Sequence, residues 1–299
     1  MRTSVVGLVL FAEVLLARPV VADGPQIREY EDALVIVDGE RPALRLTIEG
    51  EGTGTRVRVA TLYDPFGEPY LAGSEDGRQL PAIDWGVKEC HIGDRQAGPY
   101  VGDTPYRTFE RWVYGASTQN RAEVSLQRAW LDPERGHAVV LETARIVVHP
   151  LQYNRRAIDI RVRLVNVGPE RVVLPGDETF LVRLDPDRAD AGFRTPDNRF
   201  QSGSIRSRGS WLSGSSVSPT KMKTVGVAVF SDPSVRGGAP ANFTGQRDGI
   251  ISMEASSTST TLEPGASTEW SARVFCYSEA LPAVAIQDSY QGYLSGRTW

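Results

Sequence analysis

Hydrophobic and polar residues alternate with a period of two along much of the chain. Clear examples are Leu44–Ile48, Ile158–Leu164 and Trp270–Cys276, where every second residue is apolar. This period places the apolar side chains on one face of a β-strand and the polar side chains on the other. The pattern therefore predicts half-buried strands in these segments. Further predicted strands are Leu34–Val37, Arg56–Leu62, Phe109–Tyr114, Ala122–Leu131, Ala138–Val148 and Phe180–Leu184.

One segment, Val225–Phe230, has no polar residue at any position. A strand of this kind is expected to be buried on both faces. It leads into the segment Pro233–Arg247, which is rich in Pro, Gly and Asn and is predicted to be a long loop. Long loops on rigid sheets often carry functional residues. Together with two other irregular segments, Gly73–Pro105 and Asp185–Ser218, this loop is predicted to form the rim of any pocket.

Turn sequences separate the predicted strands, as in Asp38-Gly39 and Glu263-Pro264-Gly265. A helix is predicted only near the end of the chain, at Leu281–Leu294. Many strands joined by short turns indicate an all-β fold. We predict a large two-sheet antiparallel β-sandwich, formed by residues 23–299 as a single domain.

The N-terminal residues 1–22 have the features of a secretory signal peptide. Arg2 provides the positive charge, Val5–Ala12 is apolar, and Val20-Val21-Ala22 is a small-residue cleavage site. The stretch is too short and too charged to span a membrane, which takes about 20 apolar residues. We therefore expect cleavage near Ala22 and a secreted or periplasmic protein without a membrane span.

Composition excludes several kinds of partner and cofactor. The net charge is −4 and no block of basic residues is present, which argues against nucleic acid. The two cysteines, Cys90 and Cys276, are compatible with one disulfide or with two separately buried thiols. Of the three histidines, His137 is expected to face solvent and His149 to be structural. No metal site and no cofactor are predicted, and the sequence does not indicate an oligomeric state.

An ordered set of motifs resembles a known bacterial family. The motifs begin with Gly176-Asp177-Glu178-Thr179 and Arg183, continue with Gly209–Gly214 and Gly226–Pro233, and end with Pro240, Arg247, Gly249, Leu262–Gly265 and Arg273. In order and spacing they resemble the exported domains labelled "methane oxygenase PmoA-like". The resemblance covers roughly residue 34 to the C-terminus.

The resemblance implies a β-sandwich similar to the galactose-mutarotase-like supersandwich, a fold that often handles carbohydrates. It does not imply oxygenase chemistry, because the chain has no spanning helices and no paired metal ligands. One departure is notable. The family usually carries a His-His-Arg-Gly stretch near the place where this chain has Leu80–Gly86. The loss of both histidines leaves a non-catalytic member as an open alternative.

The segment Asp84–Asp94 is the first candidate for chemistry. His91 is suited to proton transfer near neutral pH, and Asp84 is a candidate for contacting a substrate. Trp85 has an indole face that could stack on a sugar ring. The alternative is a solvated loop in which Trp85 anchors the segment to the core.

The remaining candidates lie in the second half of the chain. Glu178 and Arg183 are a candidate base and a candidate clamp for a sugar or uronic acid, or else a turn residue and an exposed cation. Trp211 is either a stacking wall or a core residue. Arg247 ends the long loop and is suited to bidentate recognition of a carboxylate.

These observations predict an exported, carbohydrate-associated protein that takes a small saccharide. If it is an enzyme, we expect proton transfer on a sugar, as in an epimerase, lyase or hydrolase, with Glu178 or His91 as base and Arg247 as electrostatic stabiliser. Asp84, Trp85, Arg183 and Trp211 would bind the substrate. The alternatives are a carbohydrate-binding module without catalysis and an interaction protein of the cell envelope.

Overall fold

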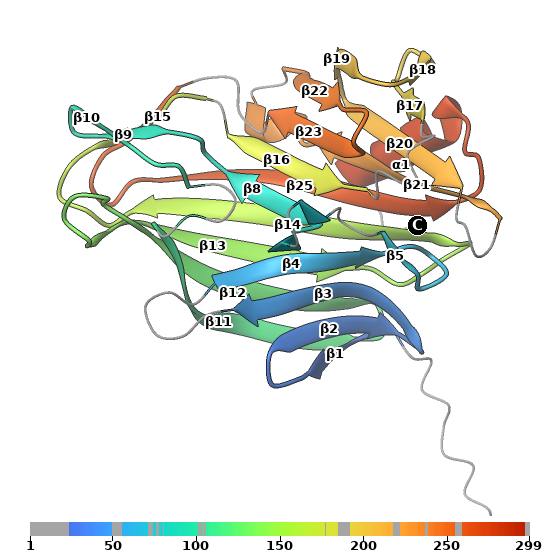
Figure 1. Cartoon of the computed structure of the whole chain (residues 1–299), viewed down its shortest axis with the longest axis horizontal. Coiled ribbons are helices and arrows are strands. Elements are labelled where there is room, and N and C mark those ends of the chain that lie inside the picture. The colour runs from blue at the N-terminus through green and yellow to red at the C-terminus, as the bar shows by residue number, and fades with distance from the viewer. Residues whose placement is uncertain are drawn as a thin grey trace, which may run out of the picture.

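The computed structural model describes residues 24–49, 56–70, 74–75, 78–79, 81–100, 104, 106–176, 178–184, 192–217, 222–236, 239–254 and 259–296. The predicted signal peptide, 1–22, lies outside the described residues. Almost all regular elements are strands, and the large sheets are antiparallel. Two large sheets pack face to face, which confirms the predicted all-β sandwich (Figure 1).

The first large sheet, sheet I, has the strand order β1-β2-β3-β4-β8-β16-β23-β22-β19, and β5 pairs with β4. Segments from both halves of the chain thus meet in its middle, where β8 pairs with β16. The strands are β1 (Pro25–Glu29), β2 (Ala33–Asp38), β3 (Arg41–Glu49), β4 (Arg56–Tyr63), β5 (Pro69–Tyr70), β8 (Ile83–Gly86), β16 (Thr179–Arg183), β19 (Ile205–Gly209), β22 (Ala241–Gly245) and β23 (Ile250–Glu254).

The second large sheet, sheet II, has the order β11-β12-β13-β14-β25-β21-β20-β17-β18. Its long central strands have the alternation expected from the sequence, and β21 is buried on both faces as predicted. The strands are β11 (Arg107–Thr118), β12 (Arg121–Leu131), β13 (Ala138–Val148), β14 (Arg155–Asn166), β17 (Gly192–Arg194), β18 (Phe200–Ser202), β20 (Trp211–Val217), β21 (Thr224–Ser231) and β25 (Ser267–Ser278).

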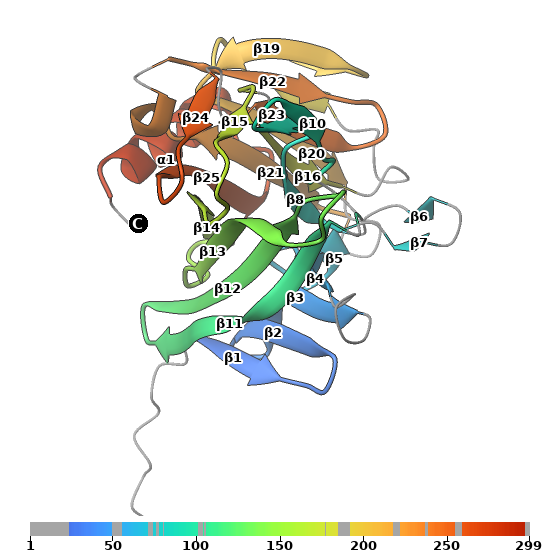
Figure 2. The same ribbon diagram turned by 90° about the vertical axis from the view of Figure 1, so that its left-hand side faces the viewer.

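Smaller elements complete the described part of the chain. The predicted C-terminal helix is confirmed as α1 (Ala283–Leu294), which packs beside β25 on the outer face of sheet II (Figure 2). No helix in the described ranges is long and apolar enough to cross a membrane. The other elements are the sheet β10 (Arg95–Ala97), β9 (Cys90–Ile92), β15 (Val172–Leu174) and β24 (Thr260–Leu262), the pair β6 (Ser74–Glu75) and β7 (Arg78–Gln79), and the 3₁₀-helix η3 (Pro233–Arg236).

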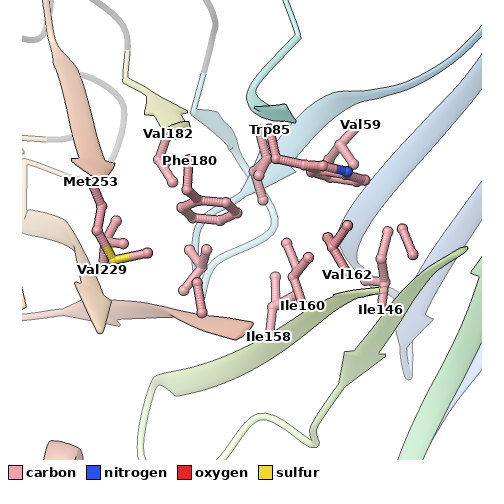
Figure 3. Close-up of a cluster of buried hydrophobic side chains, with 14 of the residues drawn as sticks. Val59, Trp85, Ile146, Ile158, Ile160, Val162, Phe180, Val182, Val229 and Met253 are labelled. Atoms are coloured by element: carbon pink, nitrogen blue, oxygen red, sulfur yellow. The ribbon is translucent and has the colours of Figure 1, made fainter. Parts of the chain in front are cut away.

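The main core lies between the two large sheets. Figure 3 shows Phe180 and Val182 of sheet I pointing toward Ile158 and Ile160 of sheet II. These four side chains are fully buried, because the apolar face of each sheet is turned toward the other. Cys276 is also buried in this core, and it forms no disulfide with the buried Cys90.

The three segments predicted as irregular loops contain strands, so that part of the prediction is wrong. Gly73–Pro105 includes β8 to β10, Asp185–Ser218 includes β17 to β20, and Pro233–Arg247 includes η3 and β22. Many of these strands have only three to five residues, and several are rich in Ser, Gly and Arg. Pairing with partners far away in the chain stabilises them, and a short window of sequence does not contain that information.

Candidate functional site

A polar cavity of about 500 Å³ lies on the outer face of sheet II, beside the C-terminal end of α1. Cavities of this size are typical of small-molecule sites. It is formed over β13, β14 and β25, whose residues of one parity face away from the core. Its polar lining consists of Arg121, Arg145, His149, Asp159, Arg161, Asp232, Ser271, Arg273 and Tyr293.

Asp159 is the central carboxylate of this cavity. Arg273 is its direct partner on the neighbouring strand, and the guanidinium donates from Nε to Oδ1 at 2.5 Å and from Nη2 to Oδ2 at 2.8 Å. His149 Nε2 lies 2.7 Å from Oδ2. Burial acts to raise the pKa of Asp159, but the hydrogen bonds from Arg273 and His149 outweigh it and leave the pKa below its usual value. The Asp159 side chain remains 29% exposed, so an ionised and oriented carboxylate faces the cavity.

Further polar groups surround Asp159. Ser271 donates from Oγ to Asp232 Oδ2 at 2.7 Å, and Tyr293 covers the Arg273 guanidinium with its ring at 4.6 Å. Burial raises the pKa of the Tyr293 hydroxyl, which therefore stays protonated and able to donate. The cavity thus presents carboxylate and hydroxyl oxygens as hydrogen-bond acceptors at fixed positions.

Arg145 supplies a guanidinium on the same face. It forms a bidentate pair with Glu123 of β12, with N–O distances of 2.7 and 2.6 Å. Arg121 and Arg161 also line the cavity and have side chains that are 51% and 55% exposed. Among the described residues, no group of three or more His, Cys, Asp or Glu side chains could hold a metal ion.

Two of the predicted site residues, Asp84 and Trp85, instead belong to a buried network around Glu142. Glu142 points into the core from β13 and is 0% exposed. Its Oε1 accepts from Trp85 Nε1, Arg107 Nη2 and Arg128 Nη1 at 2.7, 2.9 and 3.0 Å.

Glu142 Oε2 accepts from Arg107 Nε at 3.0 Å and from Trp130 Nε1 at 2.8 Å. Arg107 Nη1 also donates to the Trp85 carbonyl at 2.6 Å and lies 3.4 Å from Asp84 Oδ1. Burial acts to raise the pKa of Glu142, but the charges of Arg107 and Arg128 lower it to about 2. This network ties sheet I to sheet II.

The predicted stacking roles of both tryptophans are corrected by their burial. Trp85 is 1% exposed, and Trp211 is 0% exposed beneath α1, where its Nε1 donates to Gln287. Neither ring can present a face to a sugar. Both fill space in the interior, and their N–H groups find partners there, as buried indoles usually do.

The other predicted residues do not converge on one cavity. Glu178 is 3% exposed at the start of β16, and Arg183 at its end donates to the Pro81 carbonyl at 2.8 Å. His91 is exposed on β9, in the small sheet. Arg247 is exposed in the turn between β22 and β23, where it lines a separate open groove of about 650 Å³.

Asp159 and Arg273 were not predicted as a pair from the sequence, and His149 was expected to be structural. A usable signal was present, because alternation already turns Asp159 and Arg273 away from the core. Their contact, however, depends on the pairing of β14 with β25, which are separated by about a third of the chain. The charged inward positions of Glu142 and Arg128 were a second signal that was not used.

Several solved structures resemble this chain at a low level. An α-galactosidase from Geobacillus stearothermophilus has a TM-score of 0.46 and one from Lactobacillus brevis 0.45, each at 10% identity. The matches cover 86% and 89% of this chain, respectively, and 41% of each α-galactosidase. This chain therefore spans about two fifths of the length of these enzymes. A putative mutarotase from Salmonella typhimurium has a TM-score of 0.40 at 10% identity, covering 85% of this chain and 94% of the other. Similarity at this level does not indicate the activity of this chain.

Sequence comparison gives the family assignment. No curated protein matches the chain. Residues 105–291, which form more than half of the chain and include β12 to β14, β25 and most of α1, match the model described as "Family of unknown function (DUF6807)". The chain therefore belongs to the DUF6807 family.

Proposed function

We propose that the protein binds a carbohydrate in the cavity on the outer face of sheet II. The observation that carries this proposal is Asp159, which Arg273 and His149 hold ionised and oriented while it stays 29% exposed to the cavity. A fixed carboxylate accepts hydrogen bonds from two neighbouring hydroxyl groups of a sugar, and nearby protein donors form hydrogen bonds to the oxygens of those hydroxyl groups. The half-exposed guanidiniums of Arg121 and Arg161, with five N–H groups each, supply such donors. The resemblance to the PmoA-like family supports the same class of ligand.

The geometry favours binding over proton transfer. A general base works best when its pKa lies near the working pH, whereas the pKa of Asp159 is lowered. In His149, Nε2 is engaged by Asp159 and Nδ1 is shielded from solvent. His149 is thus a positioning residue for Asp159. This supports the non-catalytic carbohydrate-binding alternative over an epimerase, lyase or hydrolase that works through this cavity.

A thermal-shift screen tests the proposal. The probes are neutral hexoses, uronic acids and keto-sugars, each at increasing concentration. A ligand at 100 times its dissociation constant adds about 2.7 kcal/mol of stability, which is readily measured. We expect a shift with one sugar class that is lost in Asp159→Asn and weakened in Ser271→Ala, each compared with its own ligand-free melt.

Asp94→Asn is the matched control, because Asp94 is a 94% exposed carboxylate paired with Arg171 elsewhere on the surface. It should keep the full shift. Equal shifts in wild type and Asp159→Asn would contradict the assignment of the cavity. A cooperative melt without any shift across the panel would contradict carbohydrate binding itself.

We also propose that the protein is exported, on the basis of the signal-like residues 1–22. Expression of the full chain in a bacterial host should yield a periplasmic or secreted form. Mass spectrometry of that form should give an N-terminus at Asp23. A product that keeps Met1 to Ala22 and stays in the cytoplasm would contradict export.

A further inference from the structure

The hairpin that carries His149 and Asp159 ends in an unusual turn. Gln152 and Arg155 exchange backbone hydrogen bonds of 2.9 and 2.8 Å and leave a two-residue loop. The loop residues Tyr153 and Asn154 have φ values of 51° and 56°. Positive φ at both positions is the pattern of a type I′ turn, which strongly favours Asn followed by Gly.

Tyrosine at position 153 is therefore unfavourable for the backbone conformation, and burial of the side chain does not compensate for this. A bulky residue with positive φ is strained, and Asn at the same position would adopt this conformation more easily. The Tyr153 side chain gains no burial in return, since the residue is 88% exposed. Strained residues cluster at functional sites, and the strain at Tyr153 therefore motivates a functional hypothesis for this residue.

The tip of the hairpin is held in place although the ring is exposed. The Leu151 amide donates to Asp38 Oδ2 at 2.5 Å, and the Ser278 amide donates to the Asn154 carbonyl at 3.1 Å. The turn is thus anchored to β2 and to the end of β25. A rigidly presented aromatic ring binds a partner with little loss of conformational freedom.

The distance between Tyr153 and the cavity limits which ligands can contact both. Tyr153 follows His149 by four residues and precedes Asp159 by six. The regular part of β14 between Asp159 and Arg155 alone spans about 13 Å, four residues at about 3.3 Å each, and Tyr153 lies beyond Arg155 in the turn. Such a span is longer than one sugar ring. A ligand that fills the cavity and also touches Tyr153 must consist of several units.

We propose that Tyr153 is an aromatic subsite for an outer sugar unit, so that the ligand is an oligosaccharide or polysaccharide rather than a monosaccharide. This rests on the proposed carbohydrate-binding function of the cavity. The phenol ring combines an apolar face, suited to the C–H face of a pyranose, with a polar hydroxyl. Asp159 and its neighbours bind one unit, and Tyr153 stacks on another.

The test compares glycans of increasing length. An array of neutral and acidic glycans with one to six units identifies the series that wild type binds, and calorimetry then measures affinity for its monomer and its longest member. We expect the longest member to bind more tightly than the monomer. Tyr153→Ala should weaken binding of the longest member about tenfold, which corresponds to about 1.4 kcal/mol, and leave the monomer affinity unchanged.

Two further variants separate the ring from the turn. Tyr153→Phe keeps the ring and should keep most of the affinity for the longest member. Tyr153→Asn relieves the turn and should raise the melting temperature while lowering that affinity. Wild-type affinity in Tyr153→Ala, together with loss of all binding in Asp159→Asn, would overturn the subsite and leave the cavity intact. Absence of binding to every glycan would overturn both.

Discussion

Removing the negative charge of Glu142 is the most informative test of the buried network in the core. Glu142→Gln keeps the shape of the side chain but replaces one acceptor oxygen with a donor. If the amide oxygen takes the place of Oε1, the new NH₂ group faces two donors, Arg107 Nε and Trp130 Nε1. In the other orientation it faces three, from Trp85, Arg107 and Arg128. No orientation satisfies the network.

The expected loss is large because two buried guanidiniums lose the carboxylate that they share, and Arg107 keeps only the longer 3.4 Å pair with Asp84 among the ion pairs of the described residues. Arg107 and Arg128 are each 6% exposed. Removing one partner from a buried ionic group typically costs about 3–5 kcal/mol. Domains are stable by only about 5–15 kcal/mol. Glu142→Gln should therefore lower the free energy of unfolding by about 3–5 kcal/mol, measured by urea denaturation followed by circular dichroism.

Two comparisons make the result interpretable. Glu134→Gln removes a charge from a side chain that is 68% exposed and pairs with Arg95, so it should cost no more than about 1 kcal/mol. Replacing Glu142, Arg107 and Arg128 together by Met, and Asp84 by Asn, should recover part of the loss, because it removes all four charges of the network and fills the space. A Glu142→Gln variant within about 1 kcal/mol of wild type would refute the reasoning.

Two other predictions concern acid and packing. Burial acts to raise the pKa of Glu142, but the nearby guanidiniums lower it from 4.5 to about 2. The stabilisation by the Glu142 carboxylate is therefore present above pH 4.5 and is lost as the pH falls toward 2. The stability difference between wild type and Glu142→Gln should shrink over that range, and a constant difference would contradict the pKa assignment. In Gly226→Ala the new Cβ would lie 2.3 Å from Tyr277 Cζ, which should cost about 1–3 kcal/mol by thermal melting. Gly115→Ala is the control, since its Cβ would lie 3.6 Å from Ile27 Cδ1, and an equal effect of both changes would contradict the steric cause.

Much of the fold followed from the alternation of residues along the chain. The long strands β12, β13, β14 and β25 and the helix α1 lie where the pattern predicted them. Short strands such as β9 and β22 were taken for loops, because three to five residues carry too little periodicity. The burial of Trp85 and Trp211 was not predictable for the same reason, since the polar residues around each tryptophan in the sequence do not indicate whether its side chain is buried.

The candidate site was less accessible from the sequence. His91 and Arg247 were chosen because each lies in a polar or irregular segment, and Arg183 was chosen as a candidate clamp on a predicted strand. The structure leaves the three residues on different elements. Asp159 and Arg273 look like ordinary outward-facing charges when each strand is considered alone. Their ion pair exists because β14 and β25 are neighbours in register.

The sequence by itself determined the fold class, because a period of two in side-chain polarity is a local property that a chain needs in order to bury one face of each strand. It also determined which residues of the long strands face the core. Only the tertiary structure decided which strands are neighbours, and with that the network of Glu142, the cavity around Asp159 and the burial of both tryptophans. These features depend on contacts between segments far apart in the chain, and such contacts are set by the packing of the whole molecule rather than by any local pattern.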